Sequence, residues 1–415
     1  MCNSYRCLIC NDLVDSDGVE AHRINFHSDC KEYGIMWPNS DQVESVRCLR
    51  PAPIYESEYL ASQLGVKKVY IRDEGQNISG SMKDYGVEFL VRSGKRAGYE
   101  YFTVVSSGNQ AVSLAKYTQS FGCRAVVFTP AGSSKIDYLA SMENTIVFGV
   151  EDAIFEDVYS LAAGINIAGV YNTNVNNKLW LSGFTTVSDE VMALDPLPTH
   201  ILAGVGNGSY LAGIALGFCV KAAKCPKIVP VGMKGAFPTE SALQKKRMIE
   251  EYHDFFADLC EIDAAEGSIA IASYSMPQLI HAINISNGFT LGDLDNNDLK
   301  EAYKVLSMDP CLVDHGAIPE PTGIMGLASA IKHCNQFGLN DVLLISFTGH
   351  AVKDLEGLER LTGGIGQNLV SLAKNNRQDL LENNLANRPR KYIINRQIGM
   401  LGLEAMVTDI LKEWD

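Results

Sequence analysis

One lysine in a loop of small residues is the first candidate for chemistry. Residues 79–86 read SGSMKDYG, after a short apolar run at 69–71 and before a segment of helical character at 88–91. Lys83 is therefore expected where a strand gives way to a helix, the place where open α/β sheets present their reactive groups. A helix start disfavours the ammonium form, and a lysine that loses its proton easily forms Schiff bases with aldehydes. Taken alone, such a lysine is more often a solvated side chain after a turn.

A glycine loop further along the chain is suited to binding a phosphate. Gly204, Gly206, Asn207, Gly208 and Ser209 follow an apolar run and precede a helical pattern, so their backbone N–H groups can converge on an anion. The loop lacks the Gly-Lys-Ser/Thr ending of a nucleotide triphosphate site. It also has no clear acidic partner for a ribose, which argues against a dinucleotide. Tight packing is the alternative explanation for the glycines.

Two more polar groups are expected at strand ends. Ser106, Ser107, Gly108 and Asn109 follow one apolar run, and Thr348 ends another. A helix cap would explain the first group and β-propensity the second. The lysine, the glycine loop, the amide and the hydroxyl nevertheless match the aldehyde, phosphate, phenolic oxygen and ring nitrogen of pyridoxal phosphate.

These groups require an alternation of strands and helices. Short continuous apolar runs, typical of parallel strands covered on both faces, predict strands at 66–72, 102–105, 124–130, 200–203, 227–232 and 342–347. Helical patterns lie at 111–121 and 210–220, so strand, helix and strand alternate as in right-handed parallel units. The predicted fold class is α/β with open parallel sheets.

The chain resembles the tryptophan-synthase-β-like group of pyridoxal phosphate enzymes (fold type II), and within it the threonine synthases, from about Leu49 to about Leu361. Five segments carry the resemblance. Residues 73–86 (DEGQNISGSMKDYG) are similar to EGxNPTGSFKDRG, and residues 106–111 (SSGNQA) to S-S/T-G-N-T-A. Residues 205–210 (VGNGSY) are similar to VGNAGN, residues 320–323 (EPTG) to EPxG, and residues 348–354 (TGHAVKD) to TGHGLKD.

The resemblance implies a role for each group. Lys83 would be the Schiff-base lysine and the base for the substrate α-proton, Asn109 would face the phenolic oxygen, and Thr348 the ring nitrogen. The substrate would contact Ser79, Ser81, Ser106, Ser107, Gly108 and Gln110. A hydroxyl beside the ring nitrogen leaves the pyridine unprotonated, which favours elimination and replacement over transamination.

Several positions depart from the family pattern. Tyr85 stands for arginine, Gln110 for threonine, Met82 for phenylalanine and Ala351 for glycine, and Ile78-Ser79 replaces Pro-Thr. The lost arginine and threonine could organise a phosphorylated substrate. The leading hypothesis is a threonine synthase or a relative that expels a phosphate-type group and adds water or another nucleophile. The alternatives are β-replacement on O-phosphoserine or O-acetylserine, a Ser/Thr dehydratase, and a non-catalytic scaffold homologue.

The resemblance also implies two domains with the cofactor in the cleft between them. The large domain would combine residues 33–95 and 190–360, and residues 96–189 would form a small mobile domain. Residues 361–415 are expected to be a helical C-terminal extension.

Residues 1–32 form a separate element with possible metal ligands. Cys7, Cys10, His22 and His27 come close to the two-cysteine, two-histidine spacing of zinc fingers, with the central gap one residue short. Cys30 is an alternative ligand, and plain packing is the alternative role. A short polar segment of this kind folds poorly without a metal, so structural zinc is predicted.

Bulk composition limits the function classes. The net charge of −14 over 415 residues argues against nucleic-acid binding. The uncharged run 201–220 is rich in glycine and fits a strand, loop and helix better than a membrane span. The N-terminus lacks the apolar core of a signal peptide. Eleven scattered cysteines fit reduced thiols. We expect a cytoplasmic homodimer acting on a small amino acid.

Overall fold

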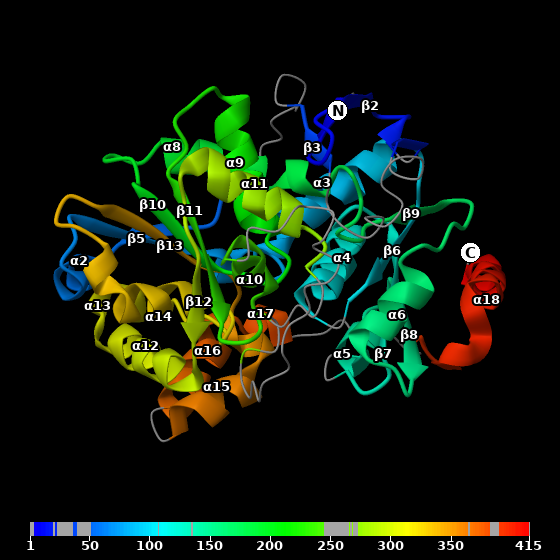
Figure 1. Cartoon of the computed structure of the whole chain (residues 1–415). Helices are drawn as coiled ribbons and strands as arrows, with labels where there is room; N and C mark the ends of the chain where they lie inside the picture. Colours follow the sequence, from blue (N-terminus) through cyan, green and yellow to red (C-terminus); the bar gives the residue numbers. More distant parts are fainter. Residues whose placement is uncertain are drawn as a thin grey trace. The chain divides into compact units, whose positions relative to one another are not determined.

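The structure is a computed structural model of the whole chain. It describes residues 4–19, 21–22, 36–39, 51–106, 108–133, 136–244, 265, 268, 273–363, 366–381 and 390–414. The chain divides into two compact units. The first contains Met1–Met82 and Leu181–Leu381, and the second contains Lys83–Trp180 and Glu382–Asp415. Figure 1 shows the elements of both units.

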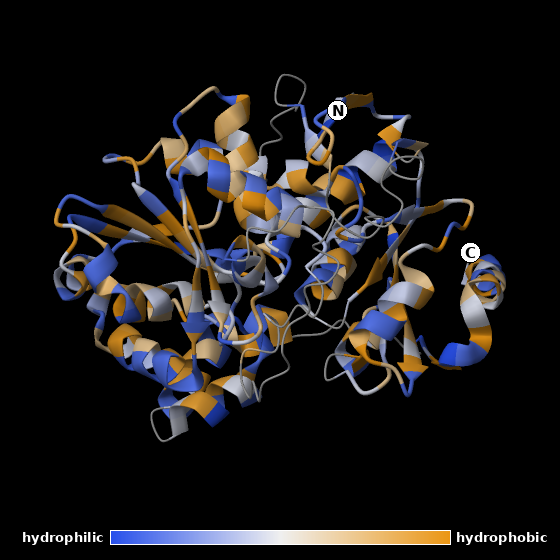
Figure 2. Cartoon of the chain, in the orientation of Figure 1, coloured by the Kyte–Doolittle hydropathy of each residue, from blue (hydrophilic) through white to orange (hydrophobic). Residues whose placement is uncertain are grey.

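The first unit is built on a six-stranded sheet in the order β12-β11-β10-β13-β5-β4. Its strands are β4 (Ile54–Glu56), β5 (Lys68–Asp73), β10 (His200–Gly204), β11 (Lys227–Met233), β12 (Leu291–Leu294) and β13 (Val342–Phe347). All neighbours are parallel except β4, which pairs antiparallel with β5. Every residue of β10 and β13 is buried, and hydrophobic residues run along these strands in Figure 2. The predicted parallel α/β architecture is confirmed here.

Helices cover both faces of this sheet. On one face lie α8 (Thr185–Met192), α9 (Ser209–Val220) and α11 (Met276–Ser286), and on the other α2 (Glu58–Leu64), α12 (Asn296–Met308) and α14 (Met325–Lys332) (Figure 1). Leucines of α2, α12 and α14 pack with β5, β10 and β13 in the main core. The remaining helices are η3 (Glu74–Gln76), α10 (Pro238–Gln244), α13 (Pro310–Asp314), η6 (Cys334–Gln336), η7 (Ala351–Lys353), α15 (Leu355–Thr362), α16 (Gly366–Asn376) and α17 (Gln378–Leu381).

The second unit is built on a five-stranded sheet in the order β14-β8-β7-β6-β9, with every pair parallel. Its strands are β6 (Tyr101–Val105), β7 (Arg124–Pro130), β8 (Thr145–Glu151), β9 (Val170–Asn172) and β14 (Lys391–Asn395). Its helices are α3 (Lys83–Arg96), α4 (Asn109–Ser120), α5 (Ile136–Ala140), α6 (Phe155–Ala162), η9 (Arg396–Ile398) and α18 (Gly399–Trp414), and α7 (Trp180–Gly183) begins at its boundary.

A small antiparallel sheet stands at the N-terminus. It has the order β2-β1-β3, from β1 (Ser4–Cys7), β2 (Leu13–Asp15) and β3 (Met36–Pro38). Strands of three or four residues bury little apolar area, so this sheet needs support beyond its own hydrogen bonds.

The C-terminal region is not helical throughout. β14 pairs with β8 and adds an edge strand to the five-stranded sheet, whereas residues 361–415 were predicted as a helical extension. The second unit also contains α3 together with residues 97–180, whereas the sequence prediction grouped residues 33–95 with the large domain. No helix among the described residues combines the length and the apolar character needed to cross a membrane.

A buried ion-pair network stabilises the carboxyl end of β5. The Arg72 guanidinium donates from Nε to Glu74 Oε1 at 2.6 Å and from Nη1 to Glu190 Oε2 at 2.5 Å. The Tyr210 hydroxyl donates to Glu74 at 2.6 Å, and burial raises the pKa of this phenol well above its ordinary value. The Arg72 cation therefore joins β5 to Glu74 in η3 and Glu190 in α8, and Glu74 extends the network to Tyr210 in α9.

Replacing Arg72 by leucine should strongly destabilise the first unit, because two carboxylates would remain without their cation. Breaking a buried pair in this way costs about 3–5 kcal/mol. The matched control on the same strand is Lys68→Leu, which removes an exposed pair with Glu56 and should cost about 1 kcal/mol or less. Thermal and urea unfolding of the two variants checks this, and equal losses would contradict it.

Candidate active site

The predicted glycine loop lies between β10 and α9 and ends in an uncapped helix start. Gly208 precedes α9 in the left-handed region, with φ 85°, and has no side chain that could cap the helix. A Cβ placed on Gly208 would stand 2.6 Å from Leu279 Cδ2, so both conformation and space require glycine. The first-turn N–H groups of α9 are therefore available to an anion, where the helix dipole also favours negative charge.

The segment before α11 fixes this loop. Tyr274 donates its backbone N–H to Asn207 Oδ1 at 2.9 Å, and the Ser273 hydroxyl donates to the Asn207 carbonyl at 3.2 Å. The Ser209 and Ser275 hydroxyl oxygens lie 2.8 Å apart. The Asn207 side chain thus accepts a hydrogen bond from the protein itself. The backbone N–H groups are therefore the loop's main means of binding a ligand.

The loop before Lys83 pairs with the chain that follows β13. Ser81 and Gly349 form an antiparallel bridge, the Met82 N–H donates to the Thr348 carbonyl at 3.0 Å, and the His350 N–H donates to the Gly80 carbonyl at 3.0 Å. Thr348 is buried at this pairing. The backbone thus fixes the residue that precedes Lys83 against the threonine predicted to face the ring nitrogen.

Two predicted substrate contacts lie in the same loop. Ser79 and Ser81 are both buried, and their hydroxyl oxygens are 3.5 Å apart. Their side chains are therefore ordered by the loop itself.

Two cations that the sequence analysis did not single out lie against this loop. Arg377 donates to the carbonyl oxygens of Gly75, Asn77 and Ile78 and pairs with Asp379 at 3.0 Å. The Lys353 ammonium is buried, and a Cβ built on Gly80 would stand 3.6 Å from its Nζ. Arg377 is nearly 300 residues away in sequence, so no local pattern could have indicated it. Lys353 lies within the TGHAVKD segment, which did carry a signal.

In the second unit, Lys83 is the first residue of α3 and lies beside an indole. Its Nζ is 5.8 Å from the Trp180 ring centroid. Trp180 is fully buried and packs against Gly86, where a Cβ would stand 2.6 Å from Cζ3 of the indole. The indole therefore restricts the lysine stem and excludes water from one side of it. The sequence analysis missed Trp180, although a glycine one turn after the lysine signals a bulky neighbour.

The predicted amide also stands at a helix start. Asn109 is the first residue of α4, and Gly108 donates its N–H to the Ser106 hydroxyl at 3.2 Å. The Ser113 hydroxyl on α4 donates to Asp84 Oδ1 at 2.7 Å, which joins the first turns of α3 and α4. The second unit thus brings the start of the Lys83 helix close to the start of the Asn109 helix.

Gln110 and Ser107 are two further residues that were predicted to contact the substrate. Gln110 is buried, and its Nε2 donates to the Thr173 carbonyl at 2.8 Å. Ser107 lies outside the described residues.

The candidate metal ligands are only partly described. Cys7, Cys10 and His22 lie together, with their ligand atoms within 4.8 Å of one another. His27 and Cys30 lie outside the described residues.

Each of the two units carries groups that suit a phosphorylated aldehyde cofactor. The glycine loop offers backbone donors where a Cβ would collide with Leu279, and a lysine amine stands at a helix start beside a buried indole. A buried threonine ends the central strand. Parallel α/β sheets with these groups define the class of enzymes that use pyridoxal phosphate.

Comparison with known proteins gives the family. Residues 47–349 match the family described as pyridoxal-phosphate dependent enzyme, and the chain belongs to it. Threonine synthase of Methanocaldococcus jannaschii is 26% identical over 327 residues, covering 74% of this chain and 76% of that protein. The chloroplastic biosynthetic threonine dehydratase of Arabidopsis thaliana is 24% identical, covering 75% of this chain and 50% of that protein.

Solved structures show the same fold. The processed form of threonine deaminase isoform 2 from Solanum lycopersicum superposes with a TM-score of 0.60 at 19% identity, covering 84% of this chain and 94% of that one. The predictions of a fold type II chain, of pyridoxal phosphate and of a pyridoxal-phosphate-dependent lyase are confirmed.

Two buried titratable groups beside the lysine loop have unusual protonation. Burial, together with the Arg377 and Lys353 cations, lowers the pKa of His350 to about 3. Its Nδ1 accepts from the Val352 N–H at 3.1 Å. Burial raises the pKa of Asp73 to about 6, against hydrogen bonds from Gln76 and Gly75. His350 is therefore neutral at physiological pH.

His350 should make the fold acid-sensitive. Its folded pKa lies below the ordinary 6.5, so the unfolded chain binds the proton first, and stability present above pH 6.5 is lost as the pH falls toward 3. The loss is about 1.4 kcal/mol per pH unit in that window. The variant His350→Asn keeps an acceptor for Val352 but cannot titrate. Between pH 7 and pH 5 it should lose about 2 kcal/mol less than the unaltered chain in urea unfolding.

The exposed His315 supplies the control for this measurement. His315→Asn should keep the pH dependence of the unaltered chain, and the opposite contribution of Asp73 is common to all three proteins. An unchanged slope in His350→Asn would contradict a buried neutral imidazole.

Proposed function

We propose that the chain catalyses an elimination on an amino acid that carries a phosphate-type leaving group, followed by addition of water or another nucleophile, as a threonine synthase does. The observation that carries the proposal is the buried Lys353 ammonium against the loop that leads to Lys83. A departing phosphate needs a cation in a water-poor site, where charge stabilisation is strongest. The similarity to a threonine synthase over three quarters of the chain supports the same reaction.

The residues proposed to hold the cofactor are Lys83, Asn109, Gly204, Gly206, Asn207, Gly208, Ser209 and Thr348. The N–H groups at the start of α9 bind its phosphate, the Asn109 amide donates to its phenolic oxygen, and the Thr348 hydroxyl donates to its ring nitrogen. Bound pyridoxal phosphate supplies an electron sink for the charge left when the substrate loses its α-proton.

Lys83 is the proposed catalytic base. Its Nζ takes the α-proton of the bound amino acid and can return it at a later carbon, because the amine stays tethered at the same place. The Trp180 indole keeps the amine oriented and partly dry. Ser79, Ser81, Ser106, Ser107 and Gly108 bind the substrate carboxylate through hydroxyl and N–H donors, and Gln110 supports their loop through Thr173.

The second candidate is a Ser/Thr dehydratase. Tyr85 is buried in α3 where threonine synthases have an arginine, so that position supplies no cation for a phosphorylated substrate. The similarity to a threonine dehydratase favours the same alternative. A β-replacement on O-phosphoserine or O-acetylserine uses the same groups, and a scaffold role would leave Lys83 and Lys353 without a purpose.

Further features of the protein belong to this proposal. Reduced cysteines in the described part of the chain are consistent with work in the cytoplasm. A homodimer, a large domain of residues 33–95 and 190–360 and a small mobile domain of residues 96–189 complete the proposal. The metal predicted for residues 1–32 would take no part in the reaction.

Removing the lysine amine should abolish both the covalent linkage and catalysis. Lys83→Ala should lose the visible absorbance of the bound cofactor and lower turnover at least about 10³-fold. The matched control is Lys95→Ala at the other end of the same helix, which should retain both. Absorbance and turnover of the purified variants give the result, and a coloured, active Lys83→Ala protein would refute the assignment.

The leaving group can be identified by product analysis. With O-phosphohomoserine, the holoenzyme should release inorganic phosphate and threonine in equal amounts. Lys353→Met keeps the apolar stem but removes the charge, and should raise the KM for that substrate about tenfold. Phosphate without threonine would contradict the proposed reaction. Ammonia and a keto acid from threonine or serine, with no effect of Lys353→Met, would establish the dehydratase instead.

A further inference from the structure

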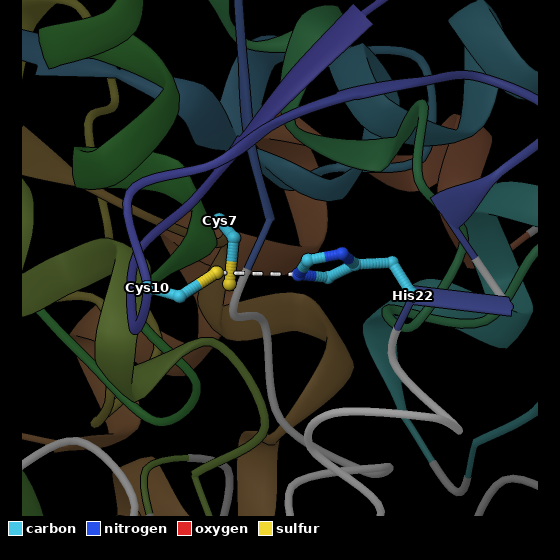
Figure 3. A group of neighbouring side chains, drawn as sticks. All are labelled: Cys7, Cys10 and His22. Atoms are coloured by element: carbon cyan, nitrogen blue, oxygen red, sulfur yellow. Dashed lines mark hydrogen bonds between the residues drawn. The ribbon is translucent and has the colours of Figure 1, made fainter.

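Two cysteines and one histidine at the N-terminus point toward one another. Figure 3 shows Cys7, Cys10 and His22 with their side chains converging from separate segments. The Cys10 Sγ and His22 Nε2 atoms are 3.3 Å apart, and all three ligand atoms lie within 4.8 Å of one another. The proposed reaction does not use any of them.

The donor set and its spacing suit zinc. Bonds of about 2.3 Å to sulfur and 2.0 Å to nitrogen around a tetrahedral ion separate the ligand atoms by about 3.5–3.8 Å. The present separations need only small side-chain adjustments to reach these values. Two thiols and an imidazole are a poor ligand set for calcium or magnesium, which take oxygen ligands.

The local backbone presents the ligands in a defined way. Cys7 ends β1, and the turn after it closes when Asn11 donates its N–H to the Cys7 carbonyl at 3.0 Å and Cys7 donates to Asp12 at 2.9 Å. Both thiols thus come from one hairpin turn. His22 comes from the helical turn after β2, where its N–H donates to Gly18 at 2.8 Å. An ion at this point would join the hairpin to the helical turn.

The same sheet is attached to the helix that supports the glycine loop. Cys7 pairs with Met36 on β3, and the Met36 carbonyl accepts from Gln278 Nε2 on α11 at 2.8 Å. Beside it, the Trp37 ring meets the edge of the His281 ring at a centroid distance of 4.6 Å. Among the described residues, a hydrogen bond and a ring contact therefore join the N-terminal sheet to α11.

Helix α11 also contacts the glycine loop that is proposed to bind the cofactor phosphate, here called the phosphate loop. Leu279 follows Gln278 and fills the space where a Cβ on Gly208 would lie. Ser273, Tyr274 and Ser275, just before α11, make the hydrogen bonds to Asn207 and Ser209. A short series of contacts thus runs from Cys7 through Met36 and α11 to the start of α9.

We propose that Cys7, Cys10 and His22 bind one zinc ion, and that this ion holds the N-terminal sheet on α11 and so steadies the phosphate loop. Three protein ligands are enough to retain zinc when another group fills the fourth position. A sheet of such short strands gains its folding free energy from the metal, as small metal-dependent elements do. The effect on the phosphate loop rests on the proposed function, whereas the metal site does not.

Metal content of the full chain tests the site. Protein purified without chelators should carry about one zinc per chain, and Cys10→Ser and His22→Gln should carry almost none. Cys334→Ser is the matched control, because it removes another exposed thiol from the same unit. Retention of zinc in Cys10→Ser, or a Cys7–Cys10 disulfide in its place, would overturn the site.

A cobalt titration of the unaltered chain tests the thiolate ligands directly. Co²⁺ added to the chelated full chain should produce thiolate charge-transfer bands and the intense visible absorbance of a tetrahedral site. A spectrum like that of hydrated Co²⁺ would refute the thiolate ligands. Trp37 fluorescence should change with the same midpoint, and Trp37→Phe should lose that response, which assigns the change to the tryptophan that lies against His281 of α11.

The effect on the cofactor is measured separately. Pyridoxal phosphate should dissociate about tenfold faster from chelated protein and from Cys10→Ser than from the zinc-loaded chain. Zinc binding with an unchanged dissociation rate would overturn the support of the phosphate loop and keep the metal site. A chain that binds zinc but no pyridoxal phosphate would refute the proposed function and, with it, the support of the phosphate loop, but not the metal site.

Discussion

The pairing of residues 80–82 with residues 348–350 is the constraint on which the candidate site depends. Two backbone hydrogen bonds, which form the bridge between Ser81 and Gly349, join a loop at the end of β5 to the segment at the end of its neighbour β13. Because both strands run parallel in the middle of the sheet, their carboxyl ends meet at one edge. The peptide before Lys83 is therefore fixed by main-chain geometry, and Arg377 reinforces it by binding three carbonyl groups of the same loop.

A site fixed by the backbone can tolerate extensive change in side chains. The glycine loop needs glycine at 208, where φ is 85° and Leu279 leaves no space, but its donors are backbone N–H groups, which every residue except proline possesses. The lysine loop likewise has Ile78-Ser79 where the family pattern has Pro-Thr, and its carbonyl groups still bind Arg377. This explains how 26% identity to a threonine synthase coexists with recognisable motifs in the same order.

Features governed by local sequence were predictable. Mainly apolar runs marked β5, β7, β10 and β13 to within a few residues, because parallel strands covered on both faces are rich in apolar side chains. The glycine loop and the small-residue loop were also predicted from local sequence, because each directly follows one of these apolar runs. Trp180, Arg377 and β14 were missed, since each acts through a partner far away in sequence. The tail looked helical from composition, and only pairing with β8 makes residues 391–395 a strand.

The departures from the family pattern change which side chains are available to recognise the substrate. Tyr85 and Gln110 are both buried, and Gln110 is bonded to Thr173, so neither position can present a cation to a phosphate. In the proposed reaction, the buried Lys353 ammonium beside the same loop bears on the choice between a phosphate ester and a free hydroxyl amino acid. The same ammonium also lowers the pKa of His350, which stays neutral and adds no second charge. A single buried ammonium binds a monovalent or divalent oxyanion by charge alone, whereas the planar guanidinium of an arginine would also fix its orientation. The chain is therefore expected to accept a wider range of anionic leaving groups than a relative with arginine at position 85.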